Sequence, residues 1–150
     1  MIKVFLDTNV LLDTMLPNRE YTVESQLILG FAAFFRLCVS PQSFPDMSYI
    51  SRTYLDAERL RKRFQYFCNH LYLLPLSAEC VDYALKSNCP DFEDAMQIAC
   101  AHENDCEIIV TGNKKHFANY TDIPVYTPGD FLEKMQANGE SRLTTSASCI

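Results

Sequence analysis

Short apolar runs that resemble buried strands alternate with longer segments of helical periodicity along most of this 150-residue chain. The strand-like runs at residues 2–6 and 107–110 are apolar almost throughout, which is typical of strands buried on both faces. Strands and helices that alternate in this way form a mainly parallel sheet with helices on both sides. The alternation therefore predicts a three-layer α/β/α domain, in which ligands bind at the carboxyl ends of the strands.

The predicted elements are separated by clear breaks. Strands are expected at residues 2–6, 37–39, 71–74, 107–110 and 125–126. Helices are expected at residues 8–15, 21–35, 56–69, 77–85, 91–103 and 128–136, with a further helix that starts near Ser43 and carries Asp46. In helix 21–35, Val23, Leu27, Phe31 and Phe34 recur at helical spacing, so this stripe is predicted to pack on the sheet.

The end of the chain differs in composition from the rest. From residue 137 onward Asn, Gly, Ser and Thr are frequent and no hydrophobic period continues. This change predicts one domain over residues 1–136, followed by a flexible C-terminal tail over residues 137–150.

Composition places the chain among globular proteins. It is 48% hydrophobic and 21% charged, and no apolar run approaches the roughly 20 residues of a membrane helix. Asp7 lies where a signal peptide would be apolar, and the seven scattered cysteines fit reduced thiols. We therefore expect a cytoplasmic protein with no membrane association.

The net charge of -6 argues against a protein that coats nucleic acid by bulk electrostatics. It leaves a metal-dependent nuclease open, because divalent ions supply positive charge locally. Basic residues gather at 59–63 and at Lys114-Lys115. Such blocks are ordinarily solvated helix faces or turns, and phosphate contact is the functional alternative.

Acidic residues gather where the predicted strands end. Asp7 directly follows strand 2–6, while Asp91 and Asp94 open the helix that leads into strand 107–110. The spacing of three puts Asp91 and Asp94 on one helix face. Because an ionised carboxylate is costly in a partly buried position unless a cation balances it, the pattern predicts a divalent metal site.

Each acid also has a structural interpretation. Asp7 and Asp91 stand where a carboxylate can cap a helix N-terminus, and Glu93 is an ordinary partner of the helix dipole. Asp13 is expected to cap a helix or face solvent. Asp94 is harder to explain in this way, because it lies beside residues that must pack.

The order and spacing of these motifs resemble the PIN domain family. The matching segments are VFLDTNVLLD at residues 4–13, DFEDA at 91–95, IVTGNKKHF at 109–117 and IPVYTP at 123–128. The resemblance covers about residues 2–135. It implies a PIN-like α/β/α domain, usually a homodimer, that cleaves RNA with Mg²⁺ or Mn²⁺ held by three or four acidic residues. Many bacterial members are toxins silenced by a small antitoxin protein, so an antitoxin partner is also implied.

The resemblance places three acidic positions of the family at Asp7, Asp46 and Asp94, which are the expected catalytic residues. Asp46 stands where Glu is usual and is one methylene shorter. The fourth position, commonly Asp, is Asn113 and offers only a neutral oxygen, for which Asp91 is the candidate to compensate. The expected metal ligands are Asp7, Asp94, Asp91 and Asn113.

Other residues take supporting roles under the same resemblance. Thr8 and Thr111 are expected to orient the ligands through hydroxyl hydrogen bonds. Gly112 stands where relatives often carry Arg, which removes one phosphate contact, and His116 is expected to be an exposed loop histidine. The expected RNA contacts are Lys114, Lys115, Arg61 and Arg63.

Other function classes fit the sequence less well. A haloacid-dehalogenase-like phosphatase needs a second acid at the position of Asn9, and a receiver domain needs an Asp at the end of strand 71–74. Four glycines form no phosphate-binding loop. Cys100 and His102 point to different helix faces, so no metal site with Cys106 is expected.

Two functions therefore remain. The first is a metal-dependent ribonuclease, the toxin component of a toxin–antitoxin pair. The second is a PIN-like domain with a weakened or inactive site that binds RNA or a partner protein. Asn113 and the shortened Asp46 motivate the second hypothesis.

Overall fold

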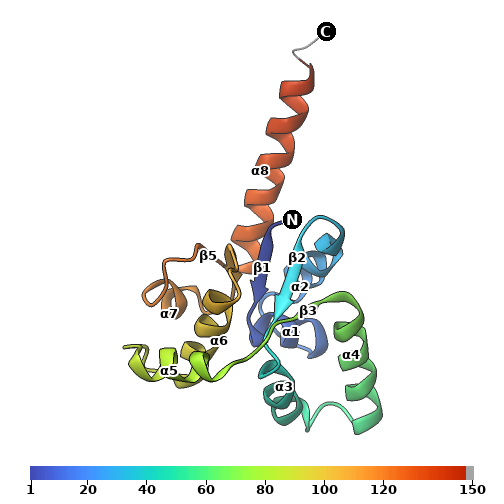
Figure 1. Cartoon of the computed structure of the whole chain (residues 1–150). Helices are drawn as coiled ribbons and strands as arrows, with labels where there is room; N and C mark the ends of the chain where they lie inside the picture. The colour runs from blue at the N-terminus through green and yellow to red at the C-terminus, as the bar shows by residue number, and fades with distance from the viewer. Residues whose placement is uncertain (148–150) are drawn as a thin grey trace.

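A computed structural model describes the backbone of residues 1–147 and the side-chain surroundings of residues 1–138. Five strands form one sheet in the order β3-β2-β1-β4-β5, and every neighbouring pair is parallel (Figure 1). The strands are β1 (Lys3–Leu6), β2 (Arg36–Val39), β3 (Tyr72–Leu73), β4 (Ile108–Val110) and β5 (Val125–Tyr126). The predicted parallel sheet is thus confirmed.

The helices follow the predicted alternation. They are α1 (Thr8–Met15), α2 (Thr22–Leu29), the 3-10 helix η1 (Gly30–Ala33), α3 (Ser43–Ser51), α4 (Ala57–His70), α5 (Ala78–Lys86), α6 (Phe92–Glu103), α7 (Lys114–Ala118) and α8 (Pro128–Ala147). Helix α7 was not predicted, because five residues are too few for a helical period to be recognised.

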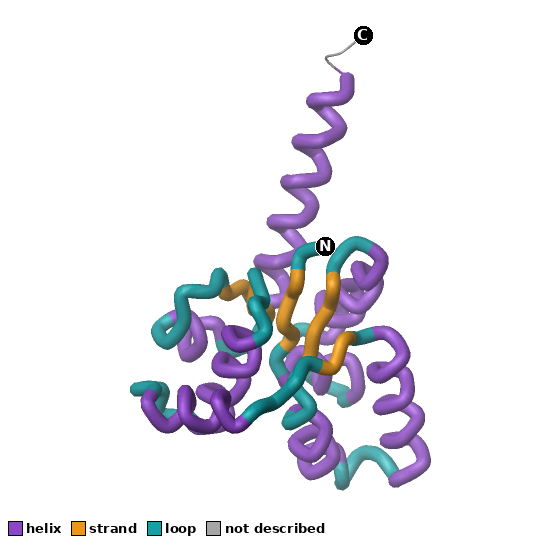
Figure 2. Tube along the Cα trace, viewed as in Figure 1, coloured by secondary structure: helices purple, strands orange, loops and turns teal. Residues whose placement is uncertain are grey.

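Alternate side chains of the central strand enter different cores, which creates the three layers. Val4 and Leu6 of β1 pack in a cluster with residues of α1, α2, α3, α4 and α8, whereas Phe5 packs in a second cluster with α5, α6 and α7. All three side chains are fully buried. Figure 2 shows the strands between these two groups of helices. The α/β/α prediction is confirmed.

The predicted helix 21–35 is wrong in length and in the face it buries. α2 ends at Leu29 and η1 follows. Val23, Leu27 and Phe34 of the predicted packing stripe are exposed, with 65%, 56% and 70% of their surface accessible. The buried residues of α2 are instead Ser25 and Ile28.

The predicted end of the last helix near residue 136 is too early. α8 continues to Ala147 and projects away from the body of the domain (Figure 1). Apart from Gly139, its last turns contain no strong helix breaker. The flexibility of residues 137–150 stays a prediction, and residues 148–150 lie outside the described part. No helix of the described residues has the length and apolar character needed to cross a membrane.

Candidate active site

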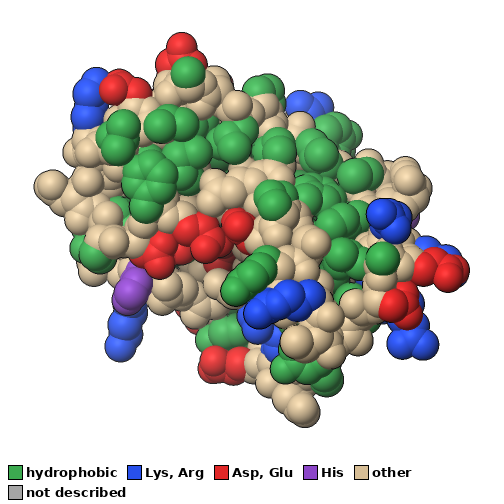
Figure 3. Space-filling model, turned by 90° about the horizontal axis from the view of Figure 1, so that it is seen from below, with side chains coloured by type: hydrophobic (Ala, Val, Ile, Leu, Met, Phe, Trp, Pro, Cys, Tyr) green, Lys and Arg blue, Asp and Glu red, His purple; other side chains and the backbone are tan. Residues whose placement is uncertain are grey.

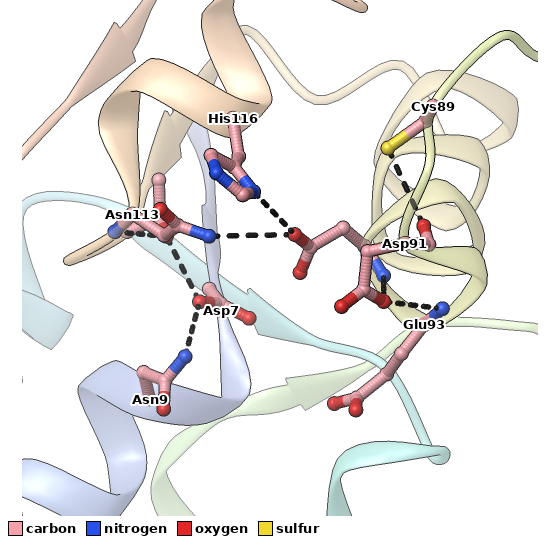
Figure 4. Close-up of polar contacts among 9 residues, drawn as sticks. Asp7, Asn9, Cys89, Asp91, Glu93, Asn113 and His116 are labelled. Carbon is pink, nitrogen blue, oxygen red and sulfur yellow. Dashed lines mark hydrogen bonds and ion pairs between the residues drawn. The ribbon is translucent and has the colours of Figure 1, made fainter.

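Asp7 occupies the carboxyl end of the central strand. Its backbone N–H donates to the Val110 carbonyl at 3.0 Å, which extends the ladder between β1 and β4 by one residue. Only 2% of the surface of Asp7 is exposed. Although Asp7 stands at the N-cap of α1, its carboxylate makes no capping hydrogen bond. The capping interpretation is therefore wrong, and the carboxylate faces the cluster shown in Figure 4.

Two donors hold one oxygen of Asp7. Thr111 Oγ1 donates to Asp7 Oδ2 at 2.9 Å, and Asn9 Nδ2 lies 3.4 Å from the same oxygen. The pKa of Asp7 is raised from 3.8 to about 6, because burial and, to a smaller extent, the nearby charge of Asp94 outweigh the opposing Thr111 hydrogen bond. Without a cation, ionised Asp7 is thus a costly group.

Asp94 approaches the same place from the first turn of α6. Its side chain is 13% exposed, and its Oδ2 lies 3.4 Å from Asn113 Nδ2 and 3.9 Å from His116 Nδ1. Burial raises the pKa of Asp94, and the charge of Asp91 adds to it. Asn113 lies in the cluster as expected, but its amide nitrogen rather than its oxygen faces Asp94. His116 is exposed as expected, although it belongs to α7 rather than to a loop.

Asp91 caps the helix that carries Asp94. Asp91 Oδ1 accepts hydrogen bonds from the backbone N–H groups of Glu93 and Asp94, at 2.9 and 3.2 Å. The capping interpretation is confirmed. A metal role for Asp91 would have to use its other oxygen, so this expected ligand stays a prediction.

Glu93 and Asp46 form a second group of carboxylates, brought together from the first turns of α6 and α3. Desolvation, together with the charges of Asp46 and Asp7, raises the pKa of Glu93 to about 7. Asp46 Oδ2 is buried and has no hydrogen-bond partner among the described residues. Sequence reasoning had assigned Glu93 only to the helix dipole. Three acids within four residues at this helix start were the available signal.

The two threonines lie differently from one another. Thr111 is buried, bonds Asp7 and accepts a hydrogen bond from the Asn113 N–H at 3.0 Å, so it lies where its predicted role requires. Thr8 instead bonds Ser43 Oγ at 2.8 Å and Gln97 Nε2 at 2.9 Å. These contacts join α1, α3 and α6, and no hydrogen bond of the Thr8 hydroxyl to an acid is found among the described side chains.

The predicted RNA contacts are scattered. Lys114 Nζ forms an ion pair with Asp130 at 2.7 Å, and Lys115 is exposed on α7. Arg61 and Arg63 are exposed on α4, which lies on the other side of the sheet from α6 and α7 (Figure 1). The structure does not bring these arginines to the acids.

Arg19, in the loop between α1 and α2, is a cation that sequence reasoning missed. Its Nε donates to Asp13 Oδ1 at 2.6 Å, and its Nη2 donates to Asn9 Oδ1 at 3.1 Å. Asp13 is 4% exposed and is also bonded by Ser25 Oγ at 3.4 Å. The expectation that Asp13 caps a helix or faces solvent is wrong, because its carboxylate is buried and paired with Arg19. The arginine offsets the desolvation cost of the buried charge.

The donor atoms at this end of the sheet fit a hard divalent cation. They are carboxylate oxygens: the charge of Asp94 raises the pKa of Asp7, the charges of Asp46 and Asp7 raise that of Glu93, and Asp46 Oδ2 is buried without a hydrogen-bond partner among the described residues. As they stand, no three Asp, Glu, His or Cys side chains of the described residues converge closely enough to hold an ion. Figure 3 shows acidic side chains gathered on this end of the molecule.

A larger hollow of about 860 Å³ lies elsewhere, between α5, α6 and the segment after α7. Tyr83, His102 and Tyr120 line it, and none of the clustered acids does. Its size alone does not make it the site of chemistry.

Comparison with known proteins identifies relatives across most of the chain. A family model described as PIN domain matches residues 3–115. Ribonuclease VapC1 of Aquifex aeolicus (strain VF5) is 27% identical over 140 residues, which is 88% of this chain and 94% of the relative. The structure of VapBC2 from Rickettsia felis, bound to a promoter DNA fragment, matches with a TM-score of 0.68 at 16% identity, covering 84% of this chain and 98% of that chain. A toxin–antitoxin complex from Klebsiella pneumoniae matches with a TM-score of 0.61 at 21% identity. This match covers 83% of this chain and 97% of the Klebsiella chain.

Proposed function

Because the chain belongs to the PIN domain family, we propose that it is a metal-dependent endoribonuclease. The observation that carries the proposal is the crowding of buried and half-buried carboxylates at the carboxyl end of β1, above all Asp7, whose pKa is raised to about 6. Groups with such perturbed pKa values in a cleft are typical of catalytic sites. The name of the Aquifex relative, a ribonuclease, supports RNA as the substrate.

Asp7 and Asp94 would hold Mg²⁺ or Mn²⁺, with Asp46 and Glu93 as further oxygen ligands. When bound, such an ion activates water and stabilises the charge that develops on the phosphate oxygens. Thr111 and Asn9 both donate to Asp7 Oδ2, so they fix this carboxylate and leave its Oδ1 to face a ligand. Glu93, with a pKa of about 7 before an ion binds, would have to lose its proton to serve as such a metal ligand.

A toxin role with a small antitoxin protein as partner belongs to the same proposal. The description of the Klebsiella structure as a toxin–antitoxin complex supports it. Exposed apolar side chains at Val23, Leu27 and Phe34 support a protein partner or a homodimer. Light scattering on the purified chain, alone and with the product of a neighbouring small reading frame, tests both assemblies.

RNA cleavage by the wild type and by Asp7→Asn, with Mg²⁺, Mn²⁺ or a chelator, tests the enzymatic proposal. We expect cleavage only by the wild type and only with an ion. Asp82→Asn, which removes an exposed carboxylate of α5 outside the cluster, is the matched control and should cleave like the wild type. The proposal fails if neither ion supports cleavage, or if Asp7→Asn cleaves equally well. Activity that appears only in Asn113→Asp would favour the alternative of a weakened site.

A further inference from the structure

A hollow of about 380 Å³ lies between the loop that follows α1 and the loop that follows β4, and Asn9 in its wall contacts Asp7. Its wall contains Arg19 and Tyr21, the carboxylates of Asp13 and Glu20, and the smaller residues Asn9, Asn18, Gly112 and Asn113. We propose that this hollow binds one nucleotide of single-stranded RNA next to the scissile phosphate, with Arg19 on a phosphate and Tyr21 against the base. The inference rests on the proposed ribonuclease function and specifies its substrate contacts. The volume lies within the roughly 300–1,000 Å³ of small-ligand sites.

Two hydrogen bonds hold the Arg19 guanidinium in place, and part of it remains available to donate to a ligand. Asp13 accepts from Nε and Asn9 accepts from Nη2, which fixes the plane of the guanidinium. Nη1, with its two protons, has no partner among the described residues, and 28% of the side chain is accessible. A guanidinium fixed in this way can donate to phosphate oxygens with little further loss of side-chain entropy.

The position of Arg19 ties the hollow to the acids. Asn9 accepts from Arg19 through its Oδ1 and lies against Asp7 Oδ2 through its Nδ2, so a single side chain separates Arg19 from Asp7. Because arginine has only donors, it also sets the orientation of the Asn9 amide. Because Asn9 bridges the two residues, a phosphate bound to Arg19 would lie next to the phosphate at the acidic cluster. Lys114, by contrast, already has an ion-pair partner in Asp130.

Tyr21 offers the apolar surface for a base. A Cβ atom placed on Gly112 would lie 3.5 Å from two carbon atoms of the Tyr21 ring. Gly112 therefore lies against one edge of the ring, and the half-buried ring forms part of the wall of the hollow. Stacking of a base on an aromatic ring is the common mode of single-strand recognition and tolerates any base.

RNA binding in an Asp7→Asn background, which keeps the probe intact, tests the hollow. The probe is a fluorescent short single-stranded RNA, and its Kd is measured by anisotropy. We expect Gly112→Leu, which fills the hollow, and Tyr21→Ala, which removes the ring, each to weaken binding about tenfold. Arg19→Gln should weaken it by a similar factor and reduce its dependence on salt. Tyr72→Ala, at the outer edge of the sheet, is the control and should change Kd less than twofold.

Unaltered Kd values in both Gly112→Leu and Tyr21→Ala would overturn the proposal. Thermal unfolding of each variant identifies any that do not fold. If Gly112→Leu does not fold, Gly112→Ala replaces it, because a methyl group at 3.5 Å from the Tyr21 ring makes only ordinary van der Waals contact. Tyr21→Phe keeps the ring and removes the hydroxyl group, so this variant should bind RNA like the wild type. Wild-type cleavage with unchanged binding of the variants would leave the ribonuclease proposal standing and remove the hollow. If the variants bind RNA more weakly but the wild type does not cleave it, the ribonuclease proposal fails while the hollow stands as an RNA-binding site.

Discussion

The buried carboxylate of Asp7, when ionised, destabilises the folded state unless a cation is bound. Its pKa is 3.8 in an unfolded chain and about 6 in the folded protein. Between these pH values the folded state holds a proton that the unfolded state has lost, so stability falls as pH rises through this window. Above pH 6 the loss is complete and amounts to about 3 kcal/mol.

Asp7→Asn should therefore stabilise the metal-free protein at pH 7.5 by about 1–3 kcal/mol, because the neutral amide removes the buried charge and can still accept from Thr111. Urea unfolding with a chelator present measures the change. The gain should nearly vanish at pH 4, where Asp7 itself is protonated. Asp130→Asn is the control and should not stabilise, since the Lys114 hydrogen bond lowers the pKa of Asp130. A less stable Asp7→Asn at pH 7.5 would contradict this account.

Glu93 tests whether the second group of carboxylates belongs to the metal site. Glu93→Gln should weaken Mn²⁺ binding about tenfold, as much as Asp46→Asn, and the double variant should lose little more because the two carboxylates act together. Isothermal titration calorimetry measures the affinities. Glu103→Gln, at the other end of α6, is the matched control. Equal affinity in the wild type and Glu93→Gln would exclude Glu93 from the site.

At this scale the sequence identifies residues whose position follows from the backbone alone. Asp7 and Asp94 were predictable because a strand end and a helix start both meet the carboxyl edge of a parallel sheet. Glu93 was missed because a glutamate in a first helical turn already has a sufficient local explanation. Arg19 was missed because its partners depend on the path of an irregular loop, which no period in the sequence encodes.

Helix α2 shows how an element can be predicted while its buried face is not. Two stripes fit its 3.6-residue period, one with Val23 and Leu27 and one with Ser25 and Ile28. The more apolar stripe was the natural choice, yet the structure buries the other. Ser25 is buried because its hydroxyl lies against Asp13, a long-range contact that hydrophobicity does not reveal.

Two substitutions on this helix should differ in their cost. Ile28→Ala should lower the free energy of unfolding by about 3 kcal/mol, because Ile28 is fully buried in the core. Leu27→Ala, one residue earlier and 56% exposed, should change it by at most about 0.5 kcal/mol. Urea unfolding of the isolated chain measures both. Similar costs at the two positions would mean that the exposed stripe is covered in solution.

The whole fold brings carboxylates from the end of β1, from α3 and from the start of α6 to one end of the sheet. The first connection from the central strand leads towards β2 and β3, whereas the last strands β4 and β5 extend the sheet on its other side. The acids meet at this topological switch beside β1, which is the general place of ligand sites in doubly wound sheets. The fold and the location of the site were therefore predictable from the alternation of elements. The pairing of particular side chains across this site was not, because it depends on helix orientations that tertiary packing sets.

Proton and metal binding should compete at this end of the molecule. Asp7 and Glu93, with pKa values of about 6 and about 7 before an ion binds, must both lose their protons to act as metal ligands. The apparent Mn²⁺ affinity should rise at least about tenfold from pH 5.5 to pH 7.5 and then level off. The same titration on Asp7→Asn should give weaker binding with a shallower pH dependence, since one of the two titrating groups is gone. The rise in melting temperature at a fixed Mn²⁺ concentration, recorded across this pH range, measures the effect on the whole fold. A wild-type affinity that is flat between pH 5.5 and 7.5 would mean that these carboxylates do not hold the ion.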